Sequence, residues 1–162
     1  MSLSAFWEAL ENLPLAMSIG EGRWFPLLES LHVLAAVSVV GSLLMVDLRL
    51  LYAAARDYSV SALSRDFLRW TWAAFVMATC TGALLFITRA SHHVHNVAFL
   101  AKLALLGLAG VNMLVFQLGA WRRVAAWNMG PPPRSARIAG AMSLALWSGV
   151  VLAGRWMGHL SY

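Results

Sequence analysis

The sequence predicts an all-α integral membrane protein, a four-helix bundle preceded by an amphipathic helix at the membrane surface. Of its 162 residues, 60% are hydrophobic and only 12% are charged, with a mean hydropathy of +0.70. Soluble domains have about 45–50% apolar and about 25% charged residues. A globule of this size cannot hide so much apolar surface from water. Four long apolar stretches, each near the roughly 20 residues that cross a bilayer, complete the prediction. A soluble enzyme, a disulfide-rich scaffold and a disordered tail are thereby excluded.

The first expected element is an interfacial helix over residues 3–13. Its apolar residues recur at helical spacing, and Pro14 ends the pattern. Because it is too short to span, we expect it to lie on the membrane surface, with Phe6 and Trp7 as anchors. The first 22 residues contain no Lys or Arg, so they lack the positive segment of a cleavable signal peptide. The first spanning helix is then expected to act as an uncleaved anchor.

Spanning helices are expected over roughly residues 26–51, 70–88, 95–121 and 138–157. The first opens with Pro26, and proline is favoured at the start of a helix. The second contains no charged residue. The stiff run Asn128-Met-Gly-Pro-Pro-Pro separates the third from the fourth. The prediction is therefore one membrane domain over residues 1–162. Within it, residues 18–23 form a turn between the interfacial helix and the first spanning helix.

The arginines indicate an orientation. Eight of the twelve Lys and Arg residues fall in the first and third loops or at the adjoining helix ends. Since cytoplasmic loops are enriched in Lys and Arg, these two loops are expected in the cytoplasm. Both termini and the loop at 89–95 then face outward. The expected location is a bacterial inner (cytoplasmic) membrane, crossed several times, with both termini in the periplasm.

Five histidines are the candidate ligands, and this topology places all of them at the outer end. His32 lies about six residues into the first helix, roughly 9 Å below its start. His92, His93 and His95 open the third helix, and His159 follows the fourth.

His32 is the strongest single candidate. Glu29 precedes it by three residues and shares its helix face. Ionisable groups at membrane depth are costly and mark functional sites by default. The alternative is structural: Glu29 bonds to His32 or to an arginine and ties helices together. Lys102, inside the third helix, also needs a partner and is expected to face Glu29. At the opposite end, Asp47 is expected to pair with Arg49 or with an arginine of the third loop.

Two imidazoles from different helices, on opposite faces of a planar macrocycle, suit a low-spin b-type haem. His32 would be one axial ligand, and the other would be one of three histidines: His95, His92 or His159. Arg155 and Arg23 would pair with the haem propionates. The expected function is that of a haem b protein, which passes electrons between the membrane pool and a redox partner on the outer side.

Two other functions stay open. Imidazole and thioether groups also suit copper, so the same end could handle copper or another transition metal, delivered by a carrier protein. The histidines could instead only form hydrogen bonds, in a structural subunit of a homo-oligomer or of a larger membrane complex. The sequence lacks nucleotide-binding and hydrolase motifs, and whether it is an enzyme is left open. Its basic residues suit phospholipid headgroups better than nucleic acid.

A resemblance to a known family rests on an ordered set of runs: Phe25-Pro-Leu-Leu-Glu-Ser-Leu-His32, Asp47-Leu-Arg-Leu-Leu51, Thr81-Gly-Ala-Leu-Leu-Phe86, Phe99-Leu-Ala-Lys102 and Gly154-Arg155. Together they resemble small uncharacterised bacterial inner-membrane proteins with four spanning helices, grouped as a domain of unknown function. The resemblance implies the fold and the membrane, and it supplies no activity. Phe99, Lys102 and Asn112 are also loosely similar to copper-resistance D-type and cytochrome b561-like membrane domains.

Overall fold

The computed structural model describes residues 3–158, and within that range the chain forms helices and connecting segments without any strand. The elements are α1 (Leu3–Glu11), α2 (Pro14–Gly20), α3 (Trp24–Leu50), α4 (Val60–Ile87), α5 (Ala90–His95), α6 (Val97–Leu118), the 3-10 helix η1 (Ala120–Ala126) and α7 (Arg134–Met157). Four of them, α3, α4, α6 and α7, are long and apolar enough to cross a membrane. The predicted all-α, four-helix membrane bundle is confirmed.

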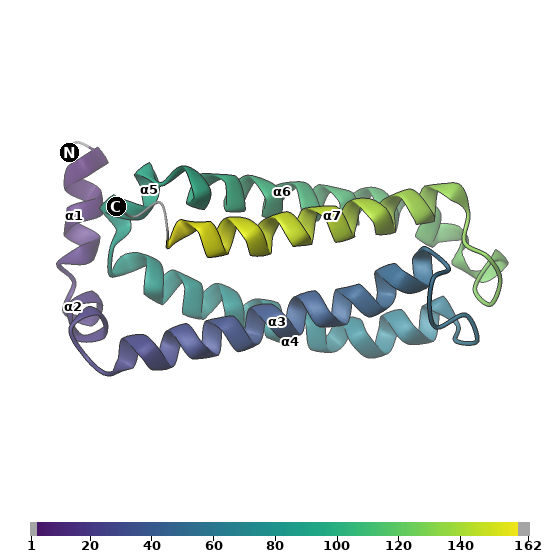
Figure 1. Cartoon of the computed structure of the whole chain (residues 1–162), viewed down its shortest axis with the longest axis horizontal. Coiled ribbons are helices and arrows are strands. Elements are labelled where there is room, and N and C mark those ends of the chain that lie inside the picture. Colours follow the sequence, from purple (N-terminus) through teal and green to yellow (C-terminus); the bar gives the residue numbers. More distant parts are fainter. Residues whose placement is uncertain (1–2, 159–162) are drawn as a thin grey trace.

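The four long helices form two antiparallel pairs (Figure 1). Helix α3 packs along α4, α6 packs along α7, and a smaller contact between α3 and α7 joins the pairs. By contrast, α4 and α6 make no extended contact with each other. One end of the bundle, here called the terminal end, carries α1, α2 and α5. The opposite, loop end carries the segments 51–59 and 119–133.

Helix α1 lies across the terminal end, at a steep angle to the four long helices (Figure 1). This is the direction expected of a helix in the membrane interface. It is also docked on the bundle. The Glu11 carboxylate accepts hydrogen bonds from the Ser91 backbone N–H (2.8 Å) and hydroxyl (2.7 Å). The Trp7 ring meets Phe86 of α4 edge-on, with centroids 5.9 Å apart.

Several boundaries differ from the sequence prediction. Pro14 ends α1 but is also the first residue of α2, which continues through part of the expected turn to Gly20. Helix α4 begins at Val60 rather than near residue 70, because Ser59 caps it by accepting from the Ala62 N–H. At 28 residues, α4 is roughly 42 Å long and exceeds the hydrocarbon thickness.

The third predicted span is interrupted. The side chain of Asn96 accepts hydrogen bonds from the N–H groups of Ala98 and Phe99, which starts a new helix at Val97. The preceding residues form the separate short helix α5. At its other end α6 stops at Leu118, and the chain continues as η1.

Arg49 organises the loop end. Its side chain is fully buried, at 0% exposure. It donates to the backbone oxygens of Tyr58 (2.9 Å), Asn128 (3.2 Å) and Gly130 (3.4 Å). The expected Asp47–Arg49 pair is therefore not formed. Among residues 3–158, the ion pair that the structure contains joins Arg65 and Asp66 at the surface.

Candidate functional site

His32 projects from α3 toward α4, about eight residues or roughly 12 Å from the start of its helix. Its Nδ1 lies 2.9 Å from the backbone oxygen of Ala78 and 3.2 Å from the Thr81 hydroxyl. A carbonyl oxygen can only accept, so Nδ1 carries the proton and donates. The other ring nitrogen, Nε2, is left with a free lone pair.

Gly82 allows this close approach of α3 and α4. A Cβ at that position would lie 3.0 Å from Cε1 of His32 and 3.3 Å from its Nδ1. The imidazole of His32 therefore packs directly on the backbone at Gly82. This contact and the hydrogen bond to Ala78 together fix the orientation of the ring.

His93, on α5, is the loop histidine that turns toward the bundle. Its half-buried ring stacks on Phe86 of α4, with centroids 6.1 Å apart, and lies 5.6 Å from the ring of Phe99 on α6. Phe86 and Phe99 also stack on each other at 5.4 Å. Within the described part of the chain, Nδ1 of His93 is buried without a hydrogen-bond partner.

The surroundings of His93 disfavour its protonated form. Burial has the largest effect and lowers the pKa of His93 below its ordinary value. Nearby positive charges lower this pKa further, and the Glu11 carboxylate opposes them. The positive groups are His92, Arg89 and Lys102.

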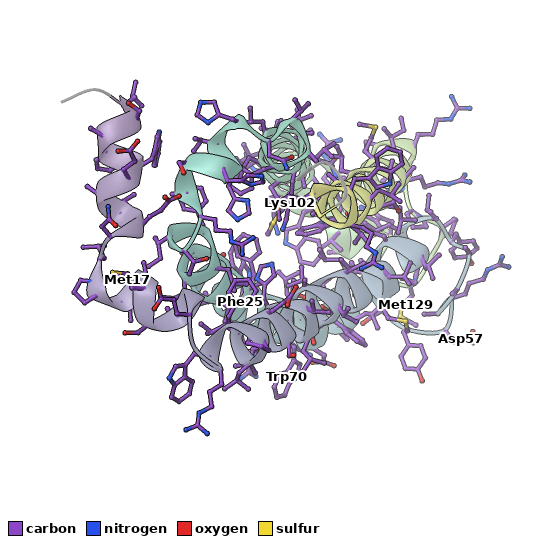
Figure 2. All side chains as sticks on the ribbon, turned by 60° about the vertical axis from the view of Figure 1, so that its left-hand side comes forward. Met17, Phe25, Asp57, Trp70, Lys102 and Met129 are labelled. Atoms are coloured by element: carbon purple, nitrogen blue, oxygen red, sulfur yellow. The ribbon has the colours of Figure 1, made fainter. Side chains whose placement is uncertain are left out.

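Lys102 completes the cluster. It is half-buried in the second turn of α6, and its Nζ would lie 3.8 Å from a Cβ added to Gly154 of α7. It is close enough for its charge to act on both His32 and His93. Figure 2 shows Lys102 in the interior, between the α6–α7 pair and α3. The three side chains lie where the two helix pairs face each other, a region called here the seam.

The expected partner of Lys102 lies elsewhere. Glu29 is exposed on the surface of α3, beside Ser30, Val33 and Leu34. No ion pair joins it to Lys102 in the range 3–158. The cluster therefore holds a buried cation without a matching carboxylate.

The remaining candidates lie at the same end but nearer the surface. His95 is exposed, and its Nδ1 lies 2.7 Å from the backbone oxygen of Ser91, one turn earlier. His92 is exposed and meets His93 edge-on. Arg155 and Arg23 are both exposed. His159 lies outside the described residues.

In one continuous helix, spacings of three and four residues would put His92, His95, Phe99 and Lys102 on the same face, and His93 would then point away from the site. The signal that could have corrected this is Asn96, a preferred N-cap residue. A helix that begins after Asn96 breaks the register between the histidines and Lys102, so His93 can face inward.

The fold and the cluster define the class: a multi-pass membrane protein with a polar histidine–lysine site between two helix pairs. A family model described as "Family of unknown function (DUF6644)" matches residues 18–160, and the chain belongs to that family. No curated protein and no solved structure matches the chain. The expected membership of an uncharacterised family is confirmed.

Proposed function

We propose that this protein binds haem b at the terminal end of the bundle and transfers electrons through it. The observation that carries the proposal is the tautomer of His32. Its Nδ1–H donates to the Ala78 carbonyl, so the lone pair of Nε2 is available to iron. Metal-ligating histidines almost always donate their other N–H to a carbonyl, carboxylate or water, which fixes the ring and raises its basicity.

His93 is the best-supported second ligand, in preference to the expected His95 or His92. It is half-buried between aromatic rings, and its Nδ1 has no partner in the described structure. His95 and His92 are exposed to the surroundings of the bundle. A planar macrocycle between His32 and His93 would also find apolar contact with Phe86 and Phe99, which would keep water from the iron.

Charge supports an anionic ligand. Lys102 is half-buried among the spanning helices and forms no ion pair with a carboxylate within residues 3–158, an arrangement that is costly in a membrane. The two propionates of haem would supply the missing negative charge, to Lys102 and to the nearby Arg155 and Arg23. Haem, when bound, supplies one-electron redox chemistry, and the protein's residues hold, orient and shield it.

Haem is favoured over copper by the number of ligands. No group of three or more His, Cys, Asp or Glu side chains that could hold a metal ion occurs in residues 3–158. A protein site for a bare transition-metal ion generally needs three or four such ligands. Haem iron has four nitrogen ligands from the porphyrin and needs only one or two ligands from the protein. His32 and His93 would supply these.

The proposal includes a bacterial inner-membrane location with the terminal end in the periplasm. Its support is the enrichment of arginine at the loop end, including Arg122, Arg123, Arg134 and Arg137, which favours the cytoplasm for that end. The lipid bilayer is then the solvent of the four long helices. The electron partner would be a protein on the periplasmic side, whether the chain acts alone, as a homo-oligomer or in a larger complex.

The test is the visible spectrum of the full-length protein, purified in detergent from cells supplied with haem precursor. The proposal expects a Soret band with sharp α and β bands on reduction. His32→Ala should abolish the low-spin spectrum, and His93→Ala should convert it to high spin. The matched control His95→Ala should leave it unchanged. A colourless protein that carries stoichiometric copper would overturn the proposal in favour of metal handling. A protein with neither cofactor would overturn it in favour of a structural subunit.

A further inference from the structure

A cavity of about 200 Å³ occupies the seam toward the loop end, away from the histidine cluster. Helices α3, α4, α6 and α7 all contribute to its wall. The wall is mainly aliphatic and aromatic, and its aromatic members are Trp72, Phe75, Phe116, Trp121 and Trp147. The cavity thus lies within the spanning helices and is suited to an apolar, flat guest.

Helices α4 and α6 both line the cavity and make no extended contact with each other, and several of their lining residues are exposed at the membrane-facing surface. Trp72 and Phe75 of α4 line it and are also 52% and 37% exposed. On the α6 side its wall includes Gly110, which has no side chain to close the gap. A molecule dissolved in the bilayer could therefore enter sideways, with a long tail left in the lipid.

One wall residue is strongly polar. Asp47 of α3 lines the cavity and is only 5% exposed. Its Oδ2 is buried and has no hydrogen-bond partner among the described residues. The Ser143 side chain of α7 interacts with the same carboxyl group. A buried oxygen without a hydrogen-bond partner is costly. A hydrogen-bond donor placed in the cavity next to Oδ2 of Asp47 would therefore be bound favourably.

The nearby side chains of Asn112, Thr71 and Arg49 donate to groups other than Asp47. The amide N–H₂ of Asn112 donates to the Ala139 backbone oxygen at 2.9 Å. The Thr71 hydroxyl lies 2.8 Å from the Ser42 hydroxyl and 2.9 Å from the Phe67 backbone oxygen. Arg49, two residues after Asp47, is held by backbone carbonyls of the loop end. Nη1 of Arg49 and Oδ2 of Asp47 are both buried without a hydrogen-bond partner among the described residues, so the two groups do not reach each other. A guest that carries a hydroxyl group would supply the donor that Oδ2 lacks.

We propose that this cavity binds the ring of a membrane-dissolved hydroquinone, whose hydroxyl donates to Oδ2 of Asp47 while its tail leaves past Trp72. The volume fits, because a cavity of about 150 Å³ holds benzene and this one has room for a ring with a few substituents. Aromatic walls favour a flat ring. A phospholipid acyl chain brings no donor, and a fused-ring sterol exceeds the space. Of the two redox forms, the hydroquinone is the one that carries a hydroxyl able to donate to Oδ2.

This inference does not depend on haem. The two sites lie in different halves of the bundle, and among the described residues Asp47 interacts with Ser143 and with no histidine. Quinol binding can therefore be measured in protein without haem, and in His32→Ala, where it should be unchanged. Failure of one proposal leaves the other standing.

The experiment compares two probes of matched size in lipid nanodiscs under reducing, oxygen-free conditions. One is a decyl-tailed benzohydroquinone, and the other is its di-O-methyl ether, which lacks both donors. Quenching of tryptophan fluorescence reports binding, because three tryptophans line the cavity. The hydroquinone should bind about tenfold more tightly than the ether, as expected for one hydrogen bond to a buried oxygen. In Asp47→Ala the two probes should bind alike.

A second variant tests the cavity itself. A Cβ at Gly110 would meet no atom within 4 Å, so Gly110→Leu should fold and occupy the space, reducing hydroquinone binding by tenfold or more. Its matched control is Gly107→Leu, one turn away on α6, equally unobstructed and not part of the wall. The proposal is overturned if the ether binds as well as the hydroquinone to the unaltered protein. It is equally overturned if neither probe binds, which would leave water as the donor to Asp47, or if Gly110→Leu and Gly107→Leu behave alike.

Discussion

Replacement of Gly82 by alanine tests whether α4 fixes the orientation of His32. The added Cβ would lie 3.0 Å from Cε1 and 3.3 Å from Nδ1 of the imidazole, closer than side-chain carbons pack. The ring cannot move away without loosening its 2.9 Å hydrogen bond to Ala78. The variant therefore strains one named contact between α3 and α4 and leaves the rest of that interface intact.

The expected magnitude follows from two opposing effects. In a helix, alanine is more stable than glycine by about 0.5–1 kcal/mol. Overpacking a close contact costs about 1–3 kcal/mol, which includes the weakened His32–Ala78 bond. The net result at Gly82 is a loss of about 1 kcal/mol, or a melting temperature lower by about 2–4 °C in a chain of this size. Gly107→Ala, where the new Cβ meets nothing within 4 Å, should instead be neutral or stabilising.

Thermal unfolding in one detergent, followed by circular dichroism, measures both variants. The decisive comparison adds His32→Ala as a double-mutant cycle. Without the imidazole, Gly82→Ala should become neutral or stabilising, which gives a coupling of about 1 kcal/mol or more between the two positions. If Gly82→Ala stabilises the unaltered protein as much as Gly107→Ala does, the proposed steric control of His32 is refuted.

Three further predictions concern the two ends of the bundle. Glu11→Ala removes both hydrogen bonds to Ser91, so amide hydrogen exchange in α1 should become at least about tenfold faster while the long helices keep their protection. Arg49→Lys keeps the charge but loses the planar fork that reaches three carbonyls, so the melting temperature should fall by at least about 4 °C. Arg137→Lys, at an exposed arginine of α7, should leave the melting temperature unchanged. Burial holds the pKa of His93 below the ordinary histidine value of about 6.5. The unfolded chain therefore binds more protons, and stability should decline as the pH falls below that ordinary value. A pH series of melting curves checks this, and His93→Gln should flatten the decline; an unaltered slope would contradict it.

The hydropathy pattern was sufficient to predict the four spanning helices, because a helix that crosses a bilayer needs a long apolar run and such runs are visible in the sequence. The same pattern did not predict where α4 begins. Arg65, Asp66 and Arg69 ended the apolar pattern, but charged residues outside the bilayer are compatible with a helix. The helix in fact begins where Ser59 caps it. Composition thus located the membrane-crossing part of α4, and the cap determined its length.

The candidate site was only partly predictable, for a similar reason. His32 could be singled out because an ionisable residue among apolar neighbours is conspicuous. Which loop histidine turns inward depends on the break at Asn96, since α5 and α6 have separate registers. The contact between His93 and Phe86 joins α5 to α4, and no local pattern reports such a pairing. The buried Oδ2 of Asp47 depends likewise on how four helices meet.

The seam explains why polar groups and stable packing can coexist in so apolar a chain. Each helix pair packs closely along its length, whereas α4 and α6 remain apart. Asp47 is buried and lines the cavity of the seam, and His32 and Lys102 are only partly exposed. Because the contacts within each pair provide most of the packing, residues of the seam can be chosen for binding rather than for stability. Substitutions that fill the cavity or remove a polar group from the seam should then alter what the protein binds. Gly82→Ala acts at a contact within one pair, between α3 and α4, and should lower stability as well as disturb His32.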